Sequence, residues 1–254
     1  MSVLLNVQDV TMHFGGVHAL TDVSFEVQDG EFLCLIGPNG AGKTTMLKAI
    51  VGAISPQEAR ILLDGREISG LPTHRRIGLG LALTHQIVRP FRSMTLTDNV
   101  ALAVGHRRIR RVWTALAGLD RDKERAEALK LLEMVGIHNH ADQEVTGQPL
   151  GVLKRLEVAR ALALKPRLLL LDEPLAGLNH VEATRLADTI VRINQEGLTI
   201  VMIEHNLGEV LRVGHRLVVL DNGRKIAEGL PRDVMQMPNV RAAYVGKEAN
   251  DAAA

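Results

Sequence analysis

The sequence predicts an α/β fold with a mostly parallel sheet covered by helices, an antiparallel β layer at the N-terminus, and an inserted helical segment. Three observations predict it. In the second half of the chain, short apolar runs alternate with amphipathic stretches, as in successive β–α units. The first thirty residues alternate between apolar and polar side chains, as antiparallel strands do. From about residue 89 to residue 163, helix caps and helical periodicity replace the strand pattern.

The N-terminal part is expected to form strands around one helix. In order, its expected elements are an alternating strand that includes 23–27, a turn at Asp29-Gly30, a buried strand at 32–36, a glycine-rich loop at 37–42, a helix from 43 to about 51, and a strand at 59–64. The loop lies between a fully apolar strand and a helix, which is the setting in which backbone N–H groups can gather around an anion.

The rest of the chain is expected to be helical first and then β–α. In order, we expect an amphipathic helix at 122–135, a helix carrying 156–164 that Pro166 ends, a strand at 167–171, a helix at 181–195, a strand at 199–203, a helix at 207–213, and a hairpin of strands 216–221 and 224–228. Residues 248–254 are expected to be a frayed tail. We therefore predict one domain over 1–254, with a core and β layer at about 1–86 and 164–246, a helical subdomain at about 87–163, and a flexible tail at 247–254.

The composition excludes several classes of protein. An apolar fraction of 46% supports a buried core, and a net charge of +1 argues against a general nucleic-acid binder. The single cysteine, Cys34, cannot form an intrachain disulfide, which fits a reducing cytosol. No apolar run approaches the roughly 20 residues of a spanning helix, and no secretory signal is evident. If the protein works at a membrane, we expect it to act from the membrane surface without spanning the bilayer.

The strongest motif is a glycine-rich loop that matches G-x-x-x-x-G-K-[ST]. It reads Gly37-Pro38-Asn39-Gly40-Ala41-Gly42-Lys43-Thr44. The glycines let several N–H groups point at one phosphate, and the following helix adds the donors of its first turn. Lys43 is expected to reach the β- and γ-phosphates, and the Thr44 hydroxyl to coordinate Mg²⁺. A chance match is disfavoured because the loop lies between a strand and a helix.

The second motif is a pair of acids after an apolar strand. Asp172 and Glu173 directly follow four consecutive leucines, 168–171. Acids are rarely placed beside a buried edge without a partner. Mg²⁺ would be the partner of Asp172, through water, and Glu173 would polarise the attacking water as a general base. Alone, the pair could be a strand end that meets a solvated turn, but the phosphate loop in the same chain makes that reading the weaker one.

These motifs resemble those of ATP-binding cassette (ABC) ATPases, and the resemblance covers about Leu4 to Gly246. It implies that Phe14 stacks on adenine, that Gln86 senses Mg²⁺ and lines a groove facing the transporter, and that His205 contacts the γ-phosphate. It also implies that 175–179 crosses a dimer interface, where Asn179 replaces the usual aspartate. ATP and Mg²⁺ are the implied cofactors. The resulting sites are catalytic Glu173, His205 and Gln86; nucleotide-binding Phe14, Gly37, Pro38, Asn39, Gly40, Ala41, Gly42, Lys43, Thr44, Thr45 and, from the opposite subunit, Gly151; and metal-binding Thr44, Gln86 and Asp172.

One family motif is altered. The family's Leu-Ser-Gly-Gly-Gln signature, which binds the γ-phosphate held by the opposite subunit, aligns with 148–152. Gly151 remains, but Pro149 replaces the serine and has neither hydroxyl nor N–H, and Val152 replaces the glutamine. Two alternatives stay open. Either a partner cassette supplies a consensus signature in a heterodimer, or Gly151 at the helix start suffices in a homodimer.

Among transporters, the chain resembles the ATPase subunits of branched-chain amino-acid importers. The resemblance depends on 14–20, a helical insertion at about 105–122, and the ending at 226–246. It implies separate membrane permease subunits, a second ABC ATPase subunit, indirectly a solute-binding protein, and no nucleic acid. It also implies a cytoplasmic protein, peripheral on the cytoplasmic face of the inner membrane, that meets the permease through a groove near Gln86 with Val88, Phe91 and Met94. The alternatives are the ATPase of a lipid or lipopolysaccharide exporter, and a soluble non-transport ABC ATPase.

Overall fold

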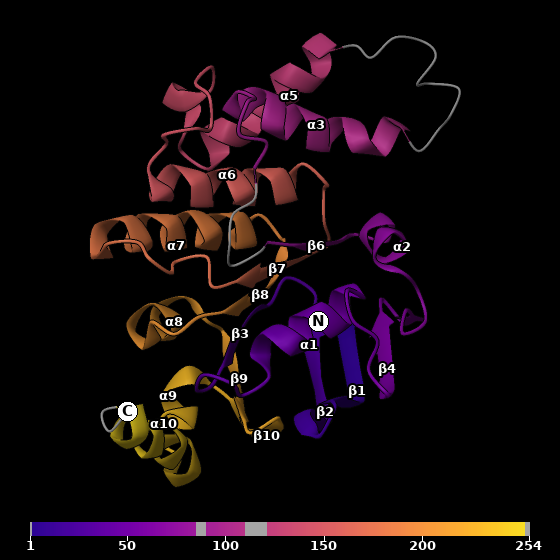
Figure 1. The fold of residues 1–254 in the computed structure, drawn as a ribbon, viewed down its shortest axis with the longest axis vertical. Helices are drawn as coiled ribbons and strands as arrows, with labels where there is room; N and C mark the ends of the chain where they lie inside the picture. Colours follow the sequence, from indigo (N-terminus) through magenta and orange to yellow (C-terminus); the bar gives the residue numbers. More distant parts are fainter. Residues whose placement is uncertain (1, 85–89, 110–120, 252–254) are drawn as a thin grey trace.

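The computed structural model describes residues 2–84, 90–109 and 121–251 of the chain (Figure 1). A six-stranded sheet and a four-stranded antiparallel sheet form the body, and the helices between β6 and β7 stack at one end. The predicted α/β fold class is confirmed. Within these ranges, no helix combines the length and the apolar character needed to cross a bilayer.

The six-stranded sheet is parallel except at one edge. Its order is β10-β9-β3-β8-β7-β6. The strands are β3 Phe32–Ile36, β6 Leu81–Leu83, β7 Leu168–Asp172, β8 Thr199–Ile203, β9 Arg216–Asp221 and β10 Arg224–Gly229. Only β10 runs antiparallel, paired with β9. The two residues between these strands, Asn222 and Gly223, both have positive φ, which is the tight hairpin that the Asp-Asn-Gly sequence predicts.

The central strands are buried on both faces, which explains their continuous apolar sequences. Along β3, Phe32, Cys34 and Ile36 face one core cluster. Leu33 and Leu35 face the other. The first cluster lies under the helices of the second half of the chain, and the second lies between the two sheets.

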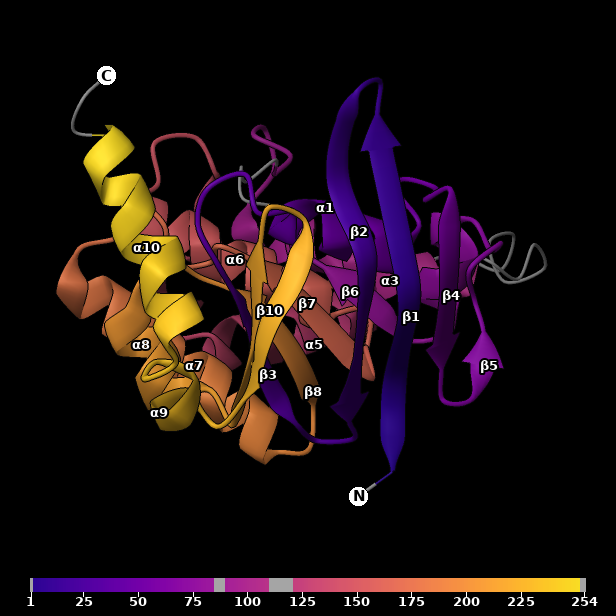
Figure 2. The same cartoon turned by 90° about the horizontal axis from the view of Figure 1, so that it is seen from below.

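The N-terminal residues form the antiparallel sheet seen at the edge of Figure 2. Its order is β2-β1-β4-β5, with β1 Val3–Phe14, β2 Val17–Gln28, β4 Glu58–Leu63 and β5 Arg66–Glu67. Helix α1, Lys43–Val51, lies over it and contributes Met46, Leu47 and Ile50 to the core between the sheets. The predicted N-terminal β layer and helix are therefore confirmed.

A buried arginine closes the C-terminal end of α1. Arg76 lies on the short helix α2, Thr73–Gly78, and its Nη1 donates to the carbonyls of Ala49 and Ile50 at 2.7 and 2.8 Å. These carbonyls belong to the last turn of α1, where backbone acceptors have no helical partner. Burial lowers the pKa of Arg76. The hydrogen bonds offset the cost of taking this charge out of water.

The helices between β6 and β7 form the inserted segment. In the described parts of this segment they are α3 Leu96–Ile109, α5 Arg121–Met134, the 3₁₀ turn His138–His140 and α6 Leu150–Leu162. In Figure 1, α6 lies between α3 and α5 on one side and α7, His180–Gln195, on the other. Helix α6 contains most of the predicted helical stretch 156–164 and extends it towards the N-terminus, because residues of the altered signature form its first turn. It ends at Leu162, before the positive φ of Lys165 and before Pro166.

The end of the chain differs from the prediction. After α8, Leu207–Val213, and β10, two helices follow: α9 Pro231–Val234 and α10 Pro238–Asp251. The frayed tail expected at 248–254 is wrong for 248–251, which are helical. The buried Val240 and the partly buried Tyr244 pack α10 on the core, and a helix once started adds residues at little further cost.

Candidate functional site

The site lies where four neighbouring parallel strands end. The carboxyl ends of β3, β8, β7 and β6 lie side by side in the sheet and lead into the phosphate loop, Glu204-His205, Glu173 and Thr84, respectively. Strands that are far apart in the sequence thus bring the predicted groups together. They meet at the edge where α/β sheets bind ligands. Asp172 shows the contact between strands, since its backbone N–H donates to Thr84 Oγ1 at 3.4 Å.

The phosphate loop has a backbone that only glycine can adopt at two places. Gly37 has φ 144°, and a Cβ atom there would lie 2.0 Å from the carbonyl oxygen of Leu220. Gly42 has φ 99°, and its Cβ would lie 2.5 Å from the carbonyl oxygen of Ala19. The loop is therefore pressed between β9 and β2. These two strands fix its curve before α1 begins at Lys43.

Lys43 is held against the loop. Its side chain is buried, and its Nζ donates to the carbonyls of Gly37 at 2.7 Å and Pro38 at 3.0 Å. These bonds place the ammonium group at the start of the loop that the motif predicts will surround phosphate.

Thr44 and Asp172 form a donor set that suits a magnesium ion. Thr44 Oγ1 donates to Asp172 Oδ1 at 3.1 Å, so a hydroxyl and a carboxylate from different elements converge. Among the described residues, no cluster of three His, Cys, Asp or Glu could hold a metal. Oxygen ligands in small number are what Mg²⁺ uses when substrate phosphates and water complete its shell. The pair therefore fits Mg²⁺ bound together with a nucleotide.

Glu173 and His205 form the second converging pair. Glu173 Oε1 lies 2.8 Å from His205 Nε2. The backbone of Glu173 has φ 49°, a left-handed conformation that costs a non-glycine residue about 1–3 kcal/mol. Its N–H donates to the carbonyl of Ile203 at 3.0 Å, at the end of β8. Strained non-glycine residues of this kind concentrate at functional sites.

Two buried charged residues at this site were not predicted. Glu204 Oε1 accepts from the Leu175 N–H at 2.7 Å and its Oε2 from the His205 N–H at 3.2 Å. Burial raises the pKa of Glu204, and these backbone N–H groups partly oppose that rise. Lys154 on α6 donates to the Glu173 carbonyl at 2.9 Å. One signal was available for Glu204, since it is an acid directly after a buried strand, as Asp172 is at the end of another.

Phe14 lies at the tip of the β1–β2 hairpin and is 51% exposed. It pairs with Val17 across the hairpin, and β2 goes on to contact the phosphate loop at Ala19. An exposed aromatic ring near that loop is available for stacking. Gln86, the other predicted residue of the nucleotide site, lies outside the described residues, as does Val88. Phe91 is described and is 52% exposed.

Residues 148–152, which were aligned with the family signature, include the start of α6. Pro149 is the N-cap and Gly151 lies buried in the first turn. A Cβ on Gly151 would lie 3.2 Å from Glu182 Oε1, so α7 approaches this turn closely. Asn179 caps α7, because its side chain accepts from the Glu182 N–H at 3.0 Å while Glu182 Oε2 accepts from the Asn179 N–H. The replacement of aspartate by asparagine keeps a good helix cap.

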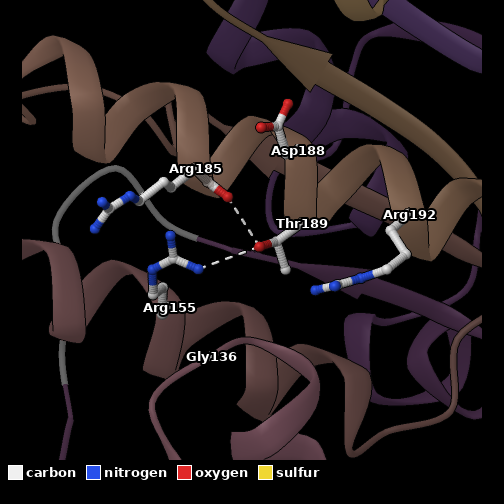
Figure 3. A pocket seen from close by; sticks show the side chains of 6 residues that line it. All are labelled: Gly136, Arg155, Arg185, Asp188, Thr189 and Arg192. Carbon is white, nitrogen blue, oxygen red and sulfur yellow. Dashed lines mark hydrogen bonds between the residues drawn. The ribbon is translucent and has the colours of Figure 1, made fainter.

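A cavity of about 430 Å³ lies between α6 and α7, beside the end of α5 (Figure 3). Arg155 Nη1 donates to the Val135 carbonyl at 2.7 Å and to Thr189 Oγ1 at 3.2 Å, and Arg192 donates to the Met134 carbonyl at 3.0 Å. Burial lowers the pKa of Arg155, and the charges of Arg185 and Arg192 add to the effect. The two donating arginines satisfy the carbonyl of the last residue of α5 and that of the residue after it. They thus fasten the inserted helices to α7.

The C-terminal helix α10 also reaches the phosphate loop. Burial raises the pKa of Tyr244 to about 12, and a hydrogen bond from the Gly37 backbone opposes the rise. Nothing in the sequence pattern links these two residues, which are far apart in the chain.

Comparison with known proteins gives a consistent result. Residues 20–176 match the ABC transporter family, and 224–250 match the family described as branched-chain amino acid ATP-binding cassette transporter. The chain is 36% identical over 253 residues to the high-affinity branched-chain amino acid transport ATP-binding protein BraF of Pseudomonas aeruginosa, covering 96% of this chain and 98% of that protein. It is 34% identical over 250 residues to the lipopolysaccharide export system ATP-binding protein LptB of Acidithiobacillus ferridurans, covering 98% and 99%.

A solved ATP-binding cassette of an ABC transporter, in its ADP conformation, has the same fold. It matches with a TM-score of 0.85 and 27% identity, covering 97% of this chain and 100% of that structure. The family match spans more than half of the sequence, and the relatives match nearly from end to end. The predicted resemblance is therefore confirmed, and the chain belongs to the ATP-binding, ATP-hydrolysing cassettes of ABC transporters.

Proposed function

We propose that this chain hydrolyses MgATP on the cytoplasmic face of the inner membrane to energise the uptake of branched-chain or related amino acids. One observation carries the proposal for the chemistry: Thr44 with Asp172, and Glu173 with His205, converge at one edge of the sheet beside the phosphate loop. The family match at 224–250 and the identity to BraF support the substrate class.

In this proposal each residue has a defined task. Backbone N–H groups from Gly40 to Thr45 and the ammonium of Lys43 bind the β- and γ-phosphates. Asn39, directly before Gly40, and Ala41, directly after it, complete the loop. Phe14 stacks on adenine. Thr44, Asp172 and Gln86 hold Mg²⁺, which neutralises charge on the phosphates when it is bound.

Glu173 accepts a proton from the attacking water. Because His205 contacts the same carboxylate, its imidazole fixes the direction in which Glu173 points and lies close to where the γ-phosphate would be. Gly151 of the opposite subunit supplies an N–H donor to that phosphate. Pro149 cannot add a second donor, because it has neither a hydroxyl nor an N–H.

The proposed assembly contains two cassettes, homologous or identical, and separate membrane permease subunits, with a solute-binding protein acting through the permease. The segment at about 87–163 acts as a helical subdomain that moves against the core at about 1–86 and 164–246 when nucleotide binds. The exposed ring of Phe91 supports a permease contact beside Gln86.

Two measurements test this function. The Glu173→Gln protein, captured from native membranes with MgATP, should carry with it polytopic permease subunits identified by mass spectrometry. In cells lacking the gene, the parent chain but not the Glu173→Gln chain should restore uptake of radiolabelled leucine. Capture of ribosomal or DNA-bound proteins instead of a permease would refute the transporter assignment.

A second candidate is lipopolysaccharide export, which the 34% identity to LptB favours. The same cells distinguish it. If the chain serves export, the deletion should cause lipopolysaccharide to accumulate at the inner membrane while leucine uptake stays at the level of the parent strain.

A further inference from the structure

Helix α6 joins the altered signature to the general base within one chain. Its first turn contains Gly151, and the next residues bring Lys154 into the interior, where the residue is only 5% exposed. Lys154 Nζ donates to the backbone carbonyl of Glu173 at 2.9 Å. One helical turn therefore separates the segment that faces the opposite subunit's nucleotide from a direct contact with the catalytic residue.

The position of Lys154 is electrostatically demanding. Burial lowers the pKa of Lys154, and the nearby carboxylates of Glu157, Glu204, Glu173 and Asp172 oppose that effect. A buried ammonium group is costly unless charges and hydrogen bonds compensate it, and an apolar side chain of similar length would fill the same space without that cost. The acids of the site are thus part of what keeps this lysine charged.

Glu173 needs such a contact because its backbone is strained. With φ 49°, the residue lies in the left-handed region, and neighbouring groups must hold it there. Its N–H is bound to Ile203 of β8, and its carbonyl is bound to Lys154 of α6. The side chain contacts His205. Lys154 is the member of this set that comes from outside the sheet edge.

We propose that Lys154 is a positioning residue that couples the signature segment of a cassette to the general base of the same cassette. This inference rests on the proposed function. When Gly151 contacts the nucleotide held by the opposite subunit, the first turn of α6 becomes fixed. Lys154 then holds the Glu173 carbonyl at a fixed position relative to that turn. Each nucleotide thereby aligns the base that acts on the other one.

The first test compares three variants with the parent in steady-state ATPase assays. Lys154→Met keeps the length but removes the donor, and it should lower kcat by roughly 10- to 100-fold, as expected for a small misplacement of a catalytic group. The KM for ATP should change less than about twofold, because Lys154 acts on Glu173, the residue of the chemical step, through its backbone carbonyl. Lys154→Arg restores a donor and should recover most of kcat. Lys130→Met, the same change at an exposed site on α5, is the control and should leave kcat unchanged.

Melting temperatures and binding of a fluorescent ATP analogue separate positioning from loss of structure. Lys154→Met should bind the analogue like the parent. If Lys154→Met fails to fold, Lys154→Gln takes its place with the same expected split, because its side chain is one atom shorter and its amide nitrogen would lie beyond hydrogen-bond distance of the Glu173 carbonyl. An unchanged kcat in a folded Lys154→Met or Lys154→Gln protein overturns the inference, and so does a kcat that Lys154→Arg fails to recover.

The second test asks which of the two nucleotide sites Lys154 serves. Dimers are assembled from two differently tagged copies, with one phosphate loop disabled by Lys43→Ala. If Lys154→Met is in the chain whose loop is intact, hydrolysis should be slow, because that chain's own Glu173 is affected. If both substitutions are in the same chain, hydrolysis should match a dimer carrying Lys43→Ala alone. The reverse pattern would place the effect at the signature and overturn the coupling to the base.

The outcomes distinguish the inference from the proposed function. If the parent hydrolyses no ATP, or Glu173→Gln is as active as the parent, the proposed function fails. If the parent is active and Glu173→Gln is inactive while Lys154→Met is normal, only the role of Lys154 fails.

Discussion

His205 Nε2 lies 2.8 Å from Glu173 Oε1, so the residues that follow two adjacent strands, β8 and β7, meet through their side chains. The contact is enforced from both sides. Glu204, the neighbour of His205, accepts from the Leu175 N–H beyond Glu173, and the Glu173 N–H donates to Ile203. The two strand ends therefore act as one unit, and a change in either should affect the same step of catalysis.

We expect the effects on kcat of changing Glu173 and His205 to be non-additive. Glu173→Gln should lower kcat by about 10²–10⁴, the usual contribution of a general base. His205→Ala should also lower kcat. The double variant should be no slower than Glu173→Gln alone, because removing one member of a pair that acts as a unit already removes the contribution of both. Steady-state ATPase assays on the four proteins give the comparison. Multiplicative losses would mean that the two side chains act independently. Glu196→Gln, an exposed carboxylate at the end of α7, is the matched control for the first change.

Thr44→Val should raise the Mg²⁺ concentration that the ATPase needs more than it weakens the binding of nucleotide. Valine keeps the shape of threonine but cannot pair with Asp172, so the oxygen donor set loses one member. The Mg²⁺ concentration needed for half-maximal ATPase activity should rise roughly 10- to 100-fold, the usual effect of disturbing a metal site. Thr184→Val, which loses a hydroxyl bonded to Glu209 away from the site, should leave the magnesium dependence unchanged. Equal curves for Thr44→Val and the parent would exclude Thr44 as a metal ligand.

Glu204 should make stability depend on pH with a defined sign. Burial raises the pKa of Glu204 in the folded state above the value of about 4.3 expected in the unfolded chain. The folded state therefore binds this proton more readily, and the contribution is fully present below the unfolded pKa and lost as pH rises through the folded pKa. Gln cannot titrate. The free energy of unfolding of the parent minus that of Glu204→Gln should therefore fall as pH increases from about 4.

Urea denaturation of both proteins across this pH range measures the difference. The substitution also places an amide where the His205 N–H finds an acceptor, which adds an offset that does not depend on pH. Only the slope bears on the prediction. A difference that is flat or increases with pH would contradict the raised pKa.

Arg155 should be needed for stability, whereas Arg185 on the same cavity should not. Arg155→Met leaves the Val135 carbonyl and the Thr189 hydroxyl without their donor, and should lower the free energy of unfolding by about 1–3 kcal/mol. Arg185 is exposed, and within the described ranges its side chain makes no hydrogen bond or ion pair. Arg185→Met should therefore stay within about 0.5 kcal/mol of the parent. Equal losses in urea denaturation would show that the shared charge, and not the hydrogen bonds, is what matters.

Much of the fold could be predicted because the local signals were strong. The buried strands are continuous apolar runs, and the phosphate loop and the Asp221-Asn222-Gly223 turn require glycine or asparagine at fixed positions. The acids at the end of β7 were recognised because charge directly after an apolar strand needs an explanation. These features depend on a few neighbouring residues, and the structure has them where the sequence indicates.

Contacts between distant segments could not be predicted. Lys154 reads as one more charge on a helix, and its burial follows only from the packing of α6 against the end of β7. Tyr244 and Arg76 are similar cases, since each meets a backbone group that no periodicity announces. The helix at the C-terminus was missed because its apolar residues are few and the sequence around them favours no single structure.

Arg76 and the phosphate loop lie at opposite ends of helix α1. Helix α1 has nine residues, so the buried guanidinium and the first turn lie about 13 Å apart at opposite ends of one dipole. The helix dipole favours a cation at the negative pole and a phosphate at the positive pole. One short helix thus offers a favourable place to a charge of each sign, the buried guanidinium at one end and a bound phosphate at the other.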